Sequence, residues 1–500
     1  MSIKNKIIRN TSIISSSGIL LGILNFIVVS ILVSHLGFEK YGVFVFILYF
    51  SVNNGFMSLF DFGIKSITTK YISQHLALNE YSKINEFINF SFFLSILIGV
   101  VISLFTLLFF HNIESYFVDI NTYSGFFDTF KWFVLSYVLQ FVNYTFIGIY
   151  EGFQRYDISK IMEVFFYVLQ SILIITIVLL NLQINYFIYV FIFIFTINFV
   201  INIIVFKRLF EFRLCFNNMR ISAVKFYDIA KHMFPTQLSS MVYNQYPKFF
   251  ILSFLNTTSL GIYDVIVKIP RFLKTIAGFI NSALMPAVSE LTALGKNESV
   301  NNIYELGFRL NLFILVPILT AVIYFAQPIM HIWINDTMHY QYMQVFVIWN
   351  LLVPYVTFGG PLLVGMNKEL KFMKNVSWSI TIVSIVVSLI LIRDLELWGI
   401  VFGQLSGLIL LPIIFSKYME IFAVNKFAFI KSNILIYLIA IIPIVFFEYF
   451  ANVSSMITLI ISGFVWCSIY WLLIYFVILN QKEKIILREV SYNLIKRFRK

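Results

Sequence analysis

Long apolar runs, separated by short polar segments, occupy most of the chain. Most of these runs come close to the roughly 20 residues that an α-helix needs to cross a bilayer. They predict an all-α, polytopic membrane protein with about 14 transmembrane helices. The predicted spans are residues 13–34, 43–60, 87–110, 131–150, 161–180, 186–206, 233–254, 262–285, 308–332, 343–366, 376–392, 397–415, 433–450 and 455–479.

The composition excludes the other broad classes. Of the 500 residues, 60% are hydrophobic and only 12% are charged, whereas soluble domains have about 45–50% apolar and about 25% charged residues. A disordered chain lacks this apolar content. The two cysteines, Cys215 and Cys467, lie far apart and form neither a disulfide framework nor a metal-binding pattern.

The basic residues indicate how the spans are oriented. The chain has 36 Lys and Arg residues and a net charge of +12. Lys131 and Arg309 lie at the edges of their spans and are counted with the adjoining loops. With the N-terminus placed in the cytoplasm, 29 of these residues then fall on the cytoplasmic side, three fall on the opposite side, and four lie inside spans. This asymmetry follows the positive-inside rule. It predicts that both termini are cytoplasmic, and it explains the basic excess without any nucleic-acid partner.

A short motif recurs after the first and the seventh spans. Leu36-Gly37 is followed by Tyr41, and Leu260-Gly261 is followed by Tyr263. The two glycines are 224 residues, or six predicted spans, apart. Such a repeat favours two six-helix lobes, as in many transporters. We therefore predict an N-terminal lobe at 1–210 (spans 1–6), a C-terminal lobe at 211–415 (spans 7–12), and two extra spans with a basic cytoplasmic tail at 416–500.

Ionisable residues inside the seventh and eighth spans are the strongest functional signal. Such residues are costly in a bilayer and usually face a cavity. Helical spacing places Asp264, Lys268 and Arg271 on one face of the eighth span, flanked by Lys274. The seventh span presents Gln237, Asn244 and Lys248 on one face. Because Lys and Arg are the usual partners of phosphate, these six cationic and amide side chains are predicted to bind an anionic substrate.

Two other interpretations of these charges stay open. The long side chains of Lys268 and Arg271, and that of the shallow Lys248, can extend to the membrane interface. Alternatively, Asp264 and Lys268 form an internal ion pair. The sequence does not separate these interpretations for Lys248.

The first lobe has a different polar character. Asn25 and Asn54 are neutral amides suited to sugar hydroxyls, although helix packing is an equal alternative. The acids Asp61 and Asp264 are candidates for coupling transport to an ion, and the choice between H+ and Na+ is open. No catalytic residue, metal site or further cofactor is predicted, because the six histidines are scattered and no nucleotide-binding loop is present in the sequence.

Four segments are distinctive: the first external turn (36–42), the end of the second span (61–64), the end of the fourth span (148–156) and the stretch 260–289. They resemble segments of Wzx-type oligosaccharide flippases, which belong to the multidrug/oligosaccharidyl-lipid/polysaccharide exporter (MOP) superfamily. Their order and topology carry the resemblance, which extends over most of residues 10–370.

The resemblance implies a fold and a function. The expected fold has two six-helix lobes around a central cavity. The expected function is alternating-access transfer of polyprenyl-pyrophosphate-linked oligosaccharide repeat units to the outer leaflet of a bacterial inner membrane, for O-antigen or capsule synthesis. The expected partners are this lipid-linked cargo, membrane lipids, and polysaccharide polymerase and chain-length proteins. Many relatives carry an acidic residue where this chain has Pro247-Lys248, so their ion coupling does not transfer directly.

Three alternatives remain beside this prediction. A peptidoglycan-precursor flippase would share the fold, although the first lobe has few basic residues. A drug or cation antiporter would call for acidic residues in the cavity, whereas the eighth span is net positive. A multispan glycan polymerase, the enzyme alternative, would need a sizeable external loop, and the longest predicted one is about 111–130. We therefore predict a transporter and not an enzyme.

Overall fold

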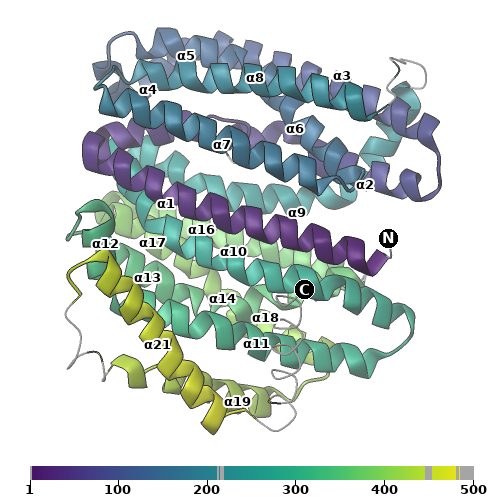
Figure 1. Ribbon diagram of the computed structural model, residues 1–500, viewed down its shortest axis with the longest axis vertical. Coiled ribbons are helices and arrows are strands. Elements are labelled where there is room, and N and C mark those ends of the chain that lie inside the picture. Colours follow the sequence, from purple (N-terminus) through teal and green to yellow (C-terminus); the bar gives the residue numbers. More distant parts are fainter. Residues whose placement is uncertain are drawn as a thin grey trace. The chain divides into compact units, whose positions relative to one another are not determined.

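The computed structural model describes residues 3–53, 55–210, 213, 219–366, 368–444, 447, 453–479 and 484. Within these residues every regular element is a helix (Figure 1). The predicted all-α fold class is therefore confirmed. Of the predicted site residues, only Asn54 lies outside the described part of the chain.

The chain forms two compact units, and each combines segments that are distant in sequence. The first contains residues 1–265 and 371–407, and the second contains 266–370 and 408–500. This division reflects compactness alone, so the lobe limits predicted at 210 and 415 stay predictions.

The first unit contains most of the helices that carry the predicted site. They are α1 (Ile3–Tyr49), η1 (Phe56–Asp61), α2 (Ile64–Ala77), α3 (Tyr81–Leu108), α4 (Phe110–Tyr116), η2 (Val118–Thr122), α5 (Phe126–Leu135), α6 (Tyr137–Gly152), α7 (Tyr156–Leu179), α8 (Asn185–Leu209), α9 (Met219–Phe254), the first turns of α10 (Thr257–Ala293), α16 (Leu370–Leu395) and α17 (Leu397–Ser406).

The second unit begins within α10. Its further helices are α11 (Asn297–Tyr324), α12 (Ala326–Ile334), α13 (Tyr340–Asn350), α14 (Val353–Thr357), α15 (Gly359–Met366), η3 (Gly407–Leu410), which starts at the unit boundary, α18 (Leu411–Ile421), α19 (Lys426–Ile439) and α21 (Met456–Val477).

The described helices support a multi-pass membrane protein but not an exact count of spans. Nine are long and apolar enough to cross a membrane, or up to eleven if two bent helix pairs each count as one span. The pair α5–α6 bends by 43°, and the pair formed by α13 with 353–366 bends by 44°. The helices α9 and α10, with 36 and 37 residues, are long but rich in polar side chains. The number fourteen is not confirmed.

The second predicted span, 43–60, differs from the observed helices. The helix α1 breaks at Gly37, which has φ 70° and ψ 173°, and the helical part that follows this break ends at Tyr49. The rest of the predicted span forms the separate helix η1, and α2 follows after Gly63, whose φ is 79°. Both glycines adopt positive φ values that other residues rarely reach, so the chain changes direction at these points.

Small residues at four-residue spacing let α3 approach α6 closely. Ser91, Ser95, Gly99 and Ser103 are all buried. A side-chain carbon on Gly99 would lie 2.7 Å from the Cα of Val138. Helices inside lipid gain little from the hydrophobic effect, so close packing and hydrogen bonds hold them together.

Hydroxyl groups supply those hydrogen bonds. The Ser95 and Thr145 hydroxyls bond to each other across α3 and α6. The Ser103 hydroxyl donates to the carbonyl of Val134 over 2.9 Å. The Ser95 bond therefore joins α3 to α6, and the Ser103 bond joins α3 to α5, where Val134 lies.

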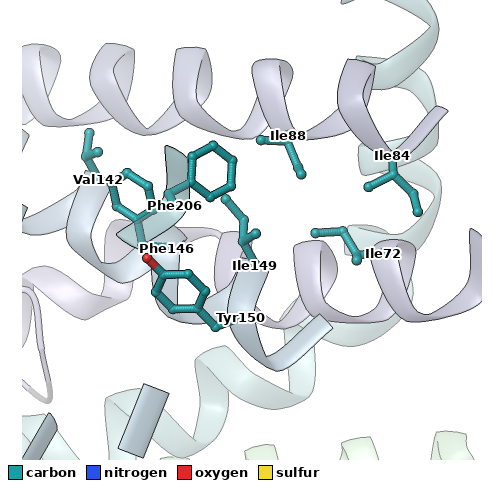
Figure 2. Packing of buried hydrophobic residues seen from close by; sticks show 8 residues of the cluster. All are labelled: Ile72, Ile84, Ile88, Val142, Phe146, Ile149, Tyr150 and Phe206. Atoms are coloured by element: carbon teal, nitrogen blue, oxygen red, sulfur yellow. The ribbon is translucent and has the colours of Figure 1, made fainter. Parts of the chain in front are cut away.

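Apolar side chains fill the interface beyond this small-residue face. Figure 2 shows eight buried residues from α2, α3, α6 and α8 that pack into one cluster. The hydroxyl of Tyr150, at the edge of the cluster, donates to the carbonyl of Asn202 over 3.2 Å. The cluster consists of Ile72, Ile84, Ile88, Val142, Phe146, Ile149, Tyr150 and Phe206.

Aromatic residues form the core of the second unit. Tyr304 of α11 stacks on Phe422 with ring centroids 4.1 Å apart. Two indoles of α21 also reach α11: Trp466 donates to the Thr320 hydroxyl over 3.3 Å, and Trp471 donates to the carbonyl of Phe313 over 2.9 Å. The last predicted span is therefore tied to α11 of its own unit.

Substitution of Gly99 tests the close approach of α3 and α6. We expect Gly99→Ala to lower the free energy of unfolding by about 1–3 kcal/mol, the usual cost of overpacking. Thermal unfolding of the detergent-purified protein measures the change. The matched control is Gly463→Ala on α21, where the added carbon meets no atom within 4 Å. The control should be neutral or stabilising, and an equal loss in both variants would contradict the packing argument.

Candidate functional site

The two segments that carry the Leu-Gly repeat are residues 36–42 of α1 and residues 257–263 at the start of α10, and we call them the Leu-Gly turns. They contact each other within the first unit. A side-chain carbon on Gly42 would lie 1.8 Å from the carbonyl oxygen of Thr257. Similarly, a side-chain carbon on Gly261 would lie 2.4 Å from the carbonyl oxygen of Phe38. Only glycine leaves room for such an approach. The sequence repeat thus marks a place where the first turn packs against its counterpart, backbone to backbone.

A buried polar cluster lies directly beside this contact. Asp264 of α10 accepts a hydrogen bond from the Tyr41 hydroxyl over 2.8 Å. Its other carboxylate oxygen lies 3.0 Å from the ammonium nitrogen of Lys248 on α9. The side chains of Lys248 and Asp264 are only 11% and 5% exposed. Three helices, α1, α9 and α10, therefore meet at one carboxylate.

This ion pair changes how the cations of the predicted site are interpreted. A buried charge is costly unless an opposite charge and hydrogen bonds compensate it. Asp264 therefore neutralises Lys248. The pairing expected from the sequence involved Lys268 alone. Lys268 itself is half-buried on α10. The anion-binding role of both lysines stays a prediction.

Arg271 and Lys274 are the two exposed cations of the predicted site. They form no ion pair with any residue that the structure describes. Arg271 follows Asp264 by two helical turns, or about 10 Å along the axis. Both belong to the second unit. Their charges are available to an anion.

The amides of the predicted site occupy three different environments. Gln237 donates to the Ser66 hydroxyl over 2.9 Å, and its carbonyl oxygen is buried without a hydrogen-bond partner among the described residues. Asn244 is exposed and donates to the carbonyl of Ser240 one turn earlier. Asn25 donates to the Tyr167 hydroxyl over 2.9 Å.

Asp61 is buried at the end of η1, only 3% exposed. Its Oδ1 atom has no hydrogen-bond partner among the described residues. Its position, just before the start of α2, is favourable for a negative charge because helix N-termini carry a partial positive charge. It contrasts with Asp264, whose two oxygens are both engaged.

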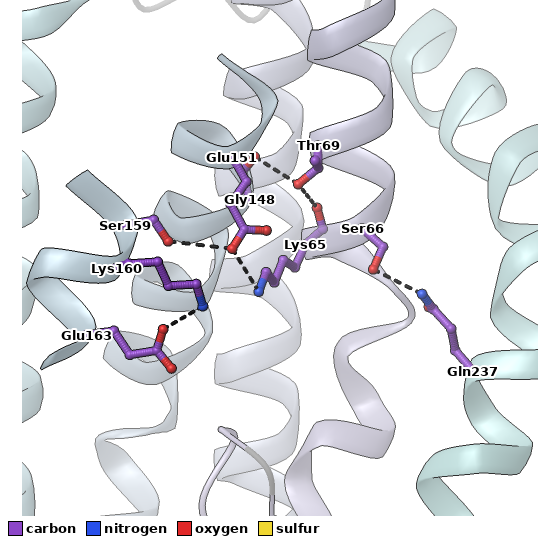
Figure 3. A network of polar contacts seen from close by, with 9 residues as sticks. All are labelled: Lys65, Ser66, Thr69, Gly148, Glu151, Ser159, Lys160, Glu163 and Gln237. Atoms are coloured by element: carbon purple, nitrogen blue, oxygen red, sulfur yellow. Dashed lines mark hydrogen bonds and ion pairs between the residues drawn. The ribbon is translucent and has the colours of Figure 1, made fainter. Parts of the chain in front are cut away.

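A network of polar side chains follows Asp61 along α2, α6 and α7. Figure 3 shows Lys65 reaching the Glu151 carboxylate over 3.3 Å. The same carboxylate oxygen accepts a bond from Ser159, 3.5 Å away. Lys160 pairs with Glu163 over 2.6 Å. The network is balanced in charge, with two cations and two acids.

Sequence reasoning missed most of this network as functional. Lys160 and Glu163 show the three-residue spacing of a helical ion pair, so the sequence alone could have predicted their pairing. Lys65 and Glu151 come from segments 86 residues apart, and only tertiary structure brings them together. Among the described residues, no three His, Cys, Asp or Glu side chains gather in a way that could hold a metal ion.

The fold is shared with solved transporters. An inward-facing multidrug resistance MATE-family transporter of the MOP superfamily matches with TM-score 0.64 and 14% identity, over 83% of this chain and 98% of its own. The lipid II flippase MurJ, in an inward closed conformation, matches with TM-score 0.66 and 13% identity, over 92% and 98%. A MOP transporter from Pyrococcus furiosus, described by a reversed polarity of its binding pocket, has TM-score 0.57 and 13% identity, over 83% and 94%.

These likenesses identify the fold as that of MOP-superfamily transporters. The polysaccharide biosynthesis protein family matches residues 7–292, more than half of the chain. The protein therefore belongs to the polysaccharide biosynthesis protein family, and the resemblance to Wzx-type flippases is confirmed at this level. A search of curated protein sequences found no match.

The buried ion pair yields a stability prediction. Asp264→Ala leaves Lys248 buried without its counter-charge, which typically costs about 3–5 kcal/mol. We expect the double variant Lys248→Met/Asp264→Leu to recover most of that loss, because both charges are gone. Thermal unfolding of the purified variants measures both effects.

An exposed pair provides the control for this prediction. Lys131 and Asp128 lie 2.9 Å apart with 46% and 82% exposed side chains, and such pairs contribute only about 0–1 kcal/mol. Asp128→Ala should therefore change stability little. If the double variant at 248 and 264 were less stable than Asp264→Ala alone, the ion-pair account would be wrong.

Proposed function

We propose that this protein is a flippase that translocates polyprenyl-pyrophosphate-linked oligosaccharide repeat units from the cytoplasmic to the outer leaflet. The membership in the polysaccharide biosynthesis family and the MOP-transporter fold support a transport role in glycan assembly. In this proposal the surface polysaccharide is O-antigen or capsule, and the membrane is the bacterial inner membrane with both chain termini cytoplasmic. Polysaccharide polymerase and chain-length proteins would act downstream.

One observation carries the choice of an anionic lipid-linked cargo. Arg271 and Lys274 present two exposed positive charges on α10, unpaired among the described residues. A pyrophosphate group carries a comparable negative charge, and charge-assisted hydrogen bonds to Arg and Lys are the usual way to hold it. A cationic drug would be repelled by the same two charges.

The first unit supports the accommodation of sugars. The polar groups that join α2 to α6 and α9 include an amide–hydroxyl pair, Gln237 with Ser66, and a balanced ion pair, Lys65 with Glu151. Groups of this kind exchange hydrogen bonds with sugar hydroxyls without attracting a charged cargo. This property supports an oligosaccharide rather than a purely lipidic substrate.

In an alternating-access cycle, the contact between the two Leu-Gly turns would have to open. The contact lacks side chains at Gly42 and Gly261, so its separation exposes little apolar surface. The pair Lys248–Asp264 and the Tyr41 hydroxyl would then loosen together. We propose this turn contact as the closed outer gate of the flippase.

Neutralisation of the α10 cations tests the proposed function. We expect Arg271→Gln/Lys274→Gln to lower surface glycan at least about tenfold in cells whose own flippase gene is deleted, because each lost charged contact typically contributes about 1.5–3 kcal/mol. Surface glycan is measured by antibody or lectin binding. Lipid-linked repeat units should accumulate in the cytoplasmic leaflet.

The control for this test is Lys296→Gln, which removes an exposed cation just beyond the end of α10. It should support normal glycan export, and immunoblots must show equal membrane levels of all variants. Full export by the double variant would rule out the anion site. Rescue of a peptidoglycan-precursor flippase mutant, or efflux of cationic drugs, would instead support one of the alternative functions.

Ion coupling is proposed for Asp61 rather than Asp264, because the Asp61 carboxylate retains an unpartnered oxygen among the described residues. We expect Asp61→Asn to abolish transport driven by an imposed H+ or Na+ gradient in proteoliposomes, while exchange without a gradient continues. Fluorescent lipid-linked oligosaccharide reports the transport. Asp157→Asn, at a carboxylate already paired with Arg155, is the control. Unchanged gradient dependence in Asp61→Asn would exclude this role.

A further inference from the structure

A cavity of about 400 Å³ opens at the end of the first unit where α8 finishes and α3 begins. Its volume falls in the range of pockets that hold small ligands. It shares no residue with the predicted substrate or ion-coupling sites. Its lining comes from α3, from the residue that follows α6, and from the last turn of α8 with the residue after it.

The depth of the cavity is apolar. Ile84, Ile88 and Phe206 line it and also belong to the buried cluster of Figure 2. On another side, the rings of Phe153 and Phe210 stack with centroids 4.3 Å apart. Hydrocarbon is the ligand chemistry that such a wall accepts.

The mouth of the cavity is open and amphipathic. Leu209 and Tyr81 line it and are 40% and 60% exposed. Tyrosine is enriched where the hydrocarbon of a membrane meets its polar surface. The cavity thus joins an apolar interior to the level at which lipid headgroups lie.

Three exposed cations are attached to or follow residues that line this mouth. Asn85 lines the cavity and makes two hydrogen bonds to the backbone of Arg213. Its amide nitrogen donates to the Arg213 carbonyl over 2.8 Å, and its amide oxygen accepts from the Arg213 N–H over 3.1 Å. The Arg213 side chain is exposed. Lys207 and Arg208, also exposed, follow the lining residue Phe206 in the last turn of α8.

These three cations form no ion pair with any residue in the described part of the chain. The nearby acid Glu80 is already engaged by His75 and Lys83. Among the described residues near the mouth one further acid, Glu86, is half-buried on α3. Glu211, next to Phe210 in the sequence, lies outside the described residues. The three cations outnumber these two acids, so the balance of charge near the mouth is positive.

We propose that this cavity binds an anionic phospholipid, with one acyl chain inside and its phosphate at Arg213 and Lys207. The apolar wall selects the chain, and the cations select the charge of the headgroup. The positive-inside distribution of Lys and Arg predicts that the site lies in the cytoplasmic leaflet, whose anionic lipids attract basic segments. The site is a lipid site of the first unit and does not depend on the identity of the transported cargo.

Native mass spectrometry of the purified full-length protein tests this site. Phosphatidylglycerol and phosphatidylcholine with identical acyl chains are added separately, and the bound fractions are compared. We expect a clear preference for phosphatidylglycerol. Arg213→Gln/Lys207→Gln should weaken phosphatidylglycerol binding about thirtyfold, since each cation near a membrane surface contributes about fivefold. Phosphatidylcholine, whose headgroup carries no net charge, should lose much less affinity, so the preference for phosphatidylglycerol falls.

Two further variants separate the cavity from general surface charge. Leu209→Trp, at an exposed lining position, should obstruct the mouth and reduce binding of both lipids. Lys371→Gln/Lys374→Gln removes two exposed cations at the start of α16 and should leave the preference unchanged. Gel filtration and thermal unfolding check that every variant folds.

Three outcomes would overturn the proposal. The first is equal binding of the two lipids by the unmodified protein. The second is an equal loss in the α16 control and the Arg213/Lys207 variant. The third is displacement of the lipid by glycerol 3-phosphate, which would mean that a phosphate group alone is recognised. Should the Arg213/Lys207 variant not fold, raised salt on the unmodified protein must still lower the preference.

Discussion

A carboxylate that is almost fully buried among membrane helices must find compensation within the protein, because apolar surroundings stabilise an isolated charge poorly. Asp264 satisfies this constraint with Lys248 on one oxygen and Tyr41 on the other. That requirement joins α1, α9 and α10 at one point, beside the glycine contact of the two repeated turns. It also decides which charges can serve a ligand. The acid and one cation are engaged with each other, whereas Arg271 and Lys274, further along the same helix, are exposed and form no ion pair with the described residues.

Small residues provide the second constraint, because they set how closely the helices of the first unit approach. The face of α3 that contains Gly99 packs against the backbone of α6. The same device recurs on α16, where a side-chain carbon on Gly403 of α17 would lie 1.8 Å from the Ser388 hydroxyl oxygen. Ser239 of α9 meets the Thr381 hydroxyl of α16 over 3.1 Å. Hydroxyl pairs and glycines thus replace the large apolar contacts of soluble proteins. The hydrogen bond of Ser239 to α16 therefore helps to fix the position of α9 and of the polar side chains that it carries.

Hydropathy predicted the all-helical class and the multi-pass character, since long apolar runs have few other stable structures. It did not resolve the second span, because the residues predicted as one helix end a first helix at Tyr49 and form the separate helix η1 at Phe56–Asp61. The choice of partner for Asp264 was also beyond the sequence. Lys268 lies one turn away on the same helix and is the local candidate, yet Lys248 reaches it from a neighbouring helix. Lys65 and Glu151 illustrate the same limit. Helical spacing predicts which residues share a face, but it does not predict which faces meet.

The net charge of +12 therefore contains cations in three different situations. Most lie in the segments that set the predicted orientation, where a headgroup layer or water surrounds them. Lys248 is compensated inside the protein. A few exposed cations have no ion-pair partner among the described residues and lie next to a defined feature of the fold: Arg271 and Lys274 on α10, and Lys207 and Arg213 at the mouth of an apolar cavity. A charge becomes informative about a ligand only in this last situation, because no partner neutralises its field and it lies next to a feature that can receive a ligand. Position and pairing, rather than the total, connect the basic character of the chain to its chemistry.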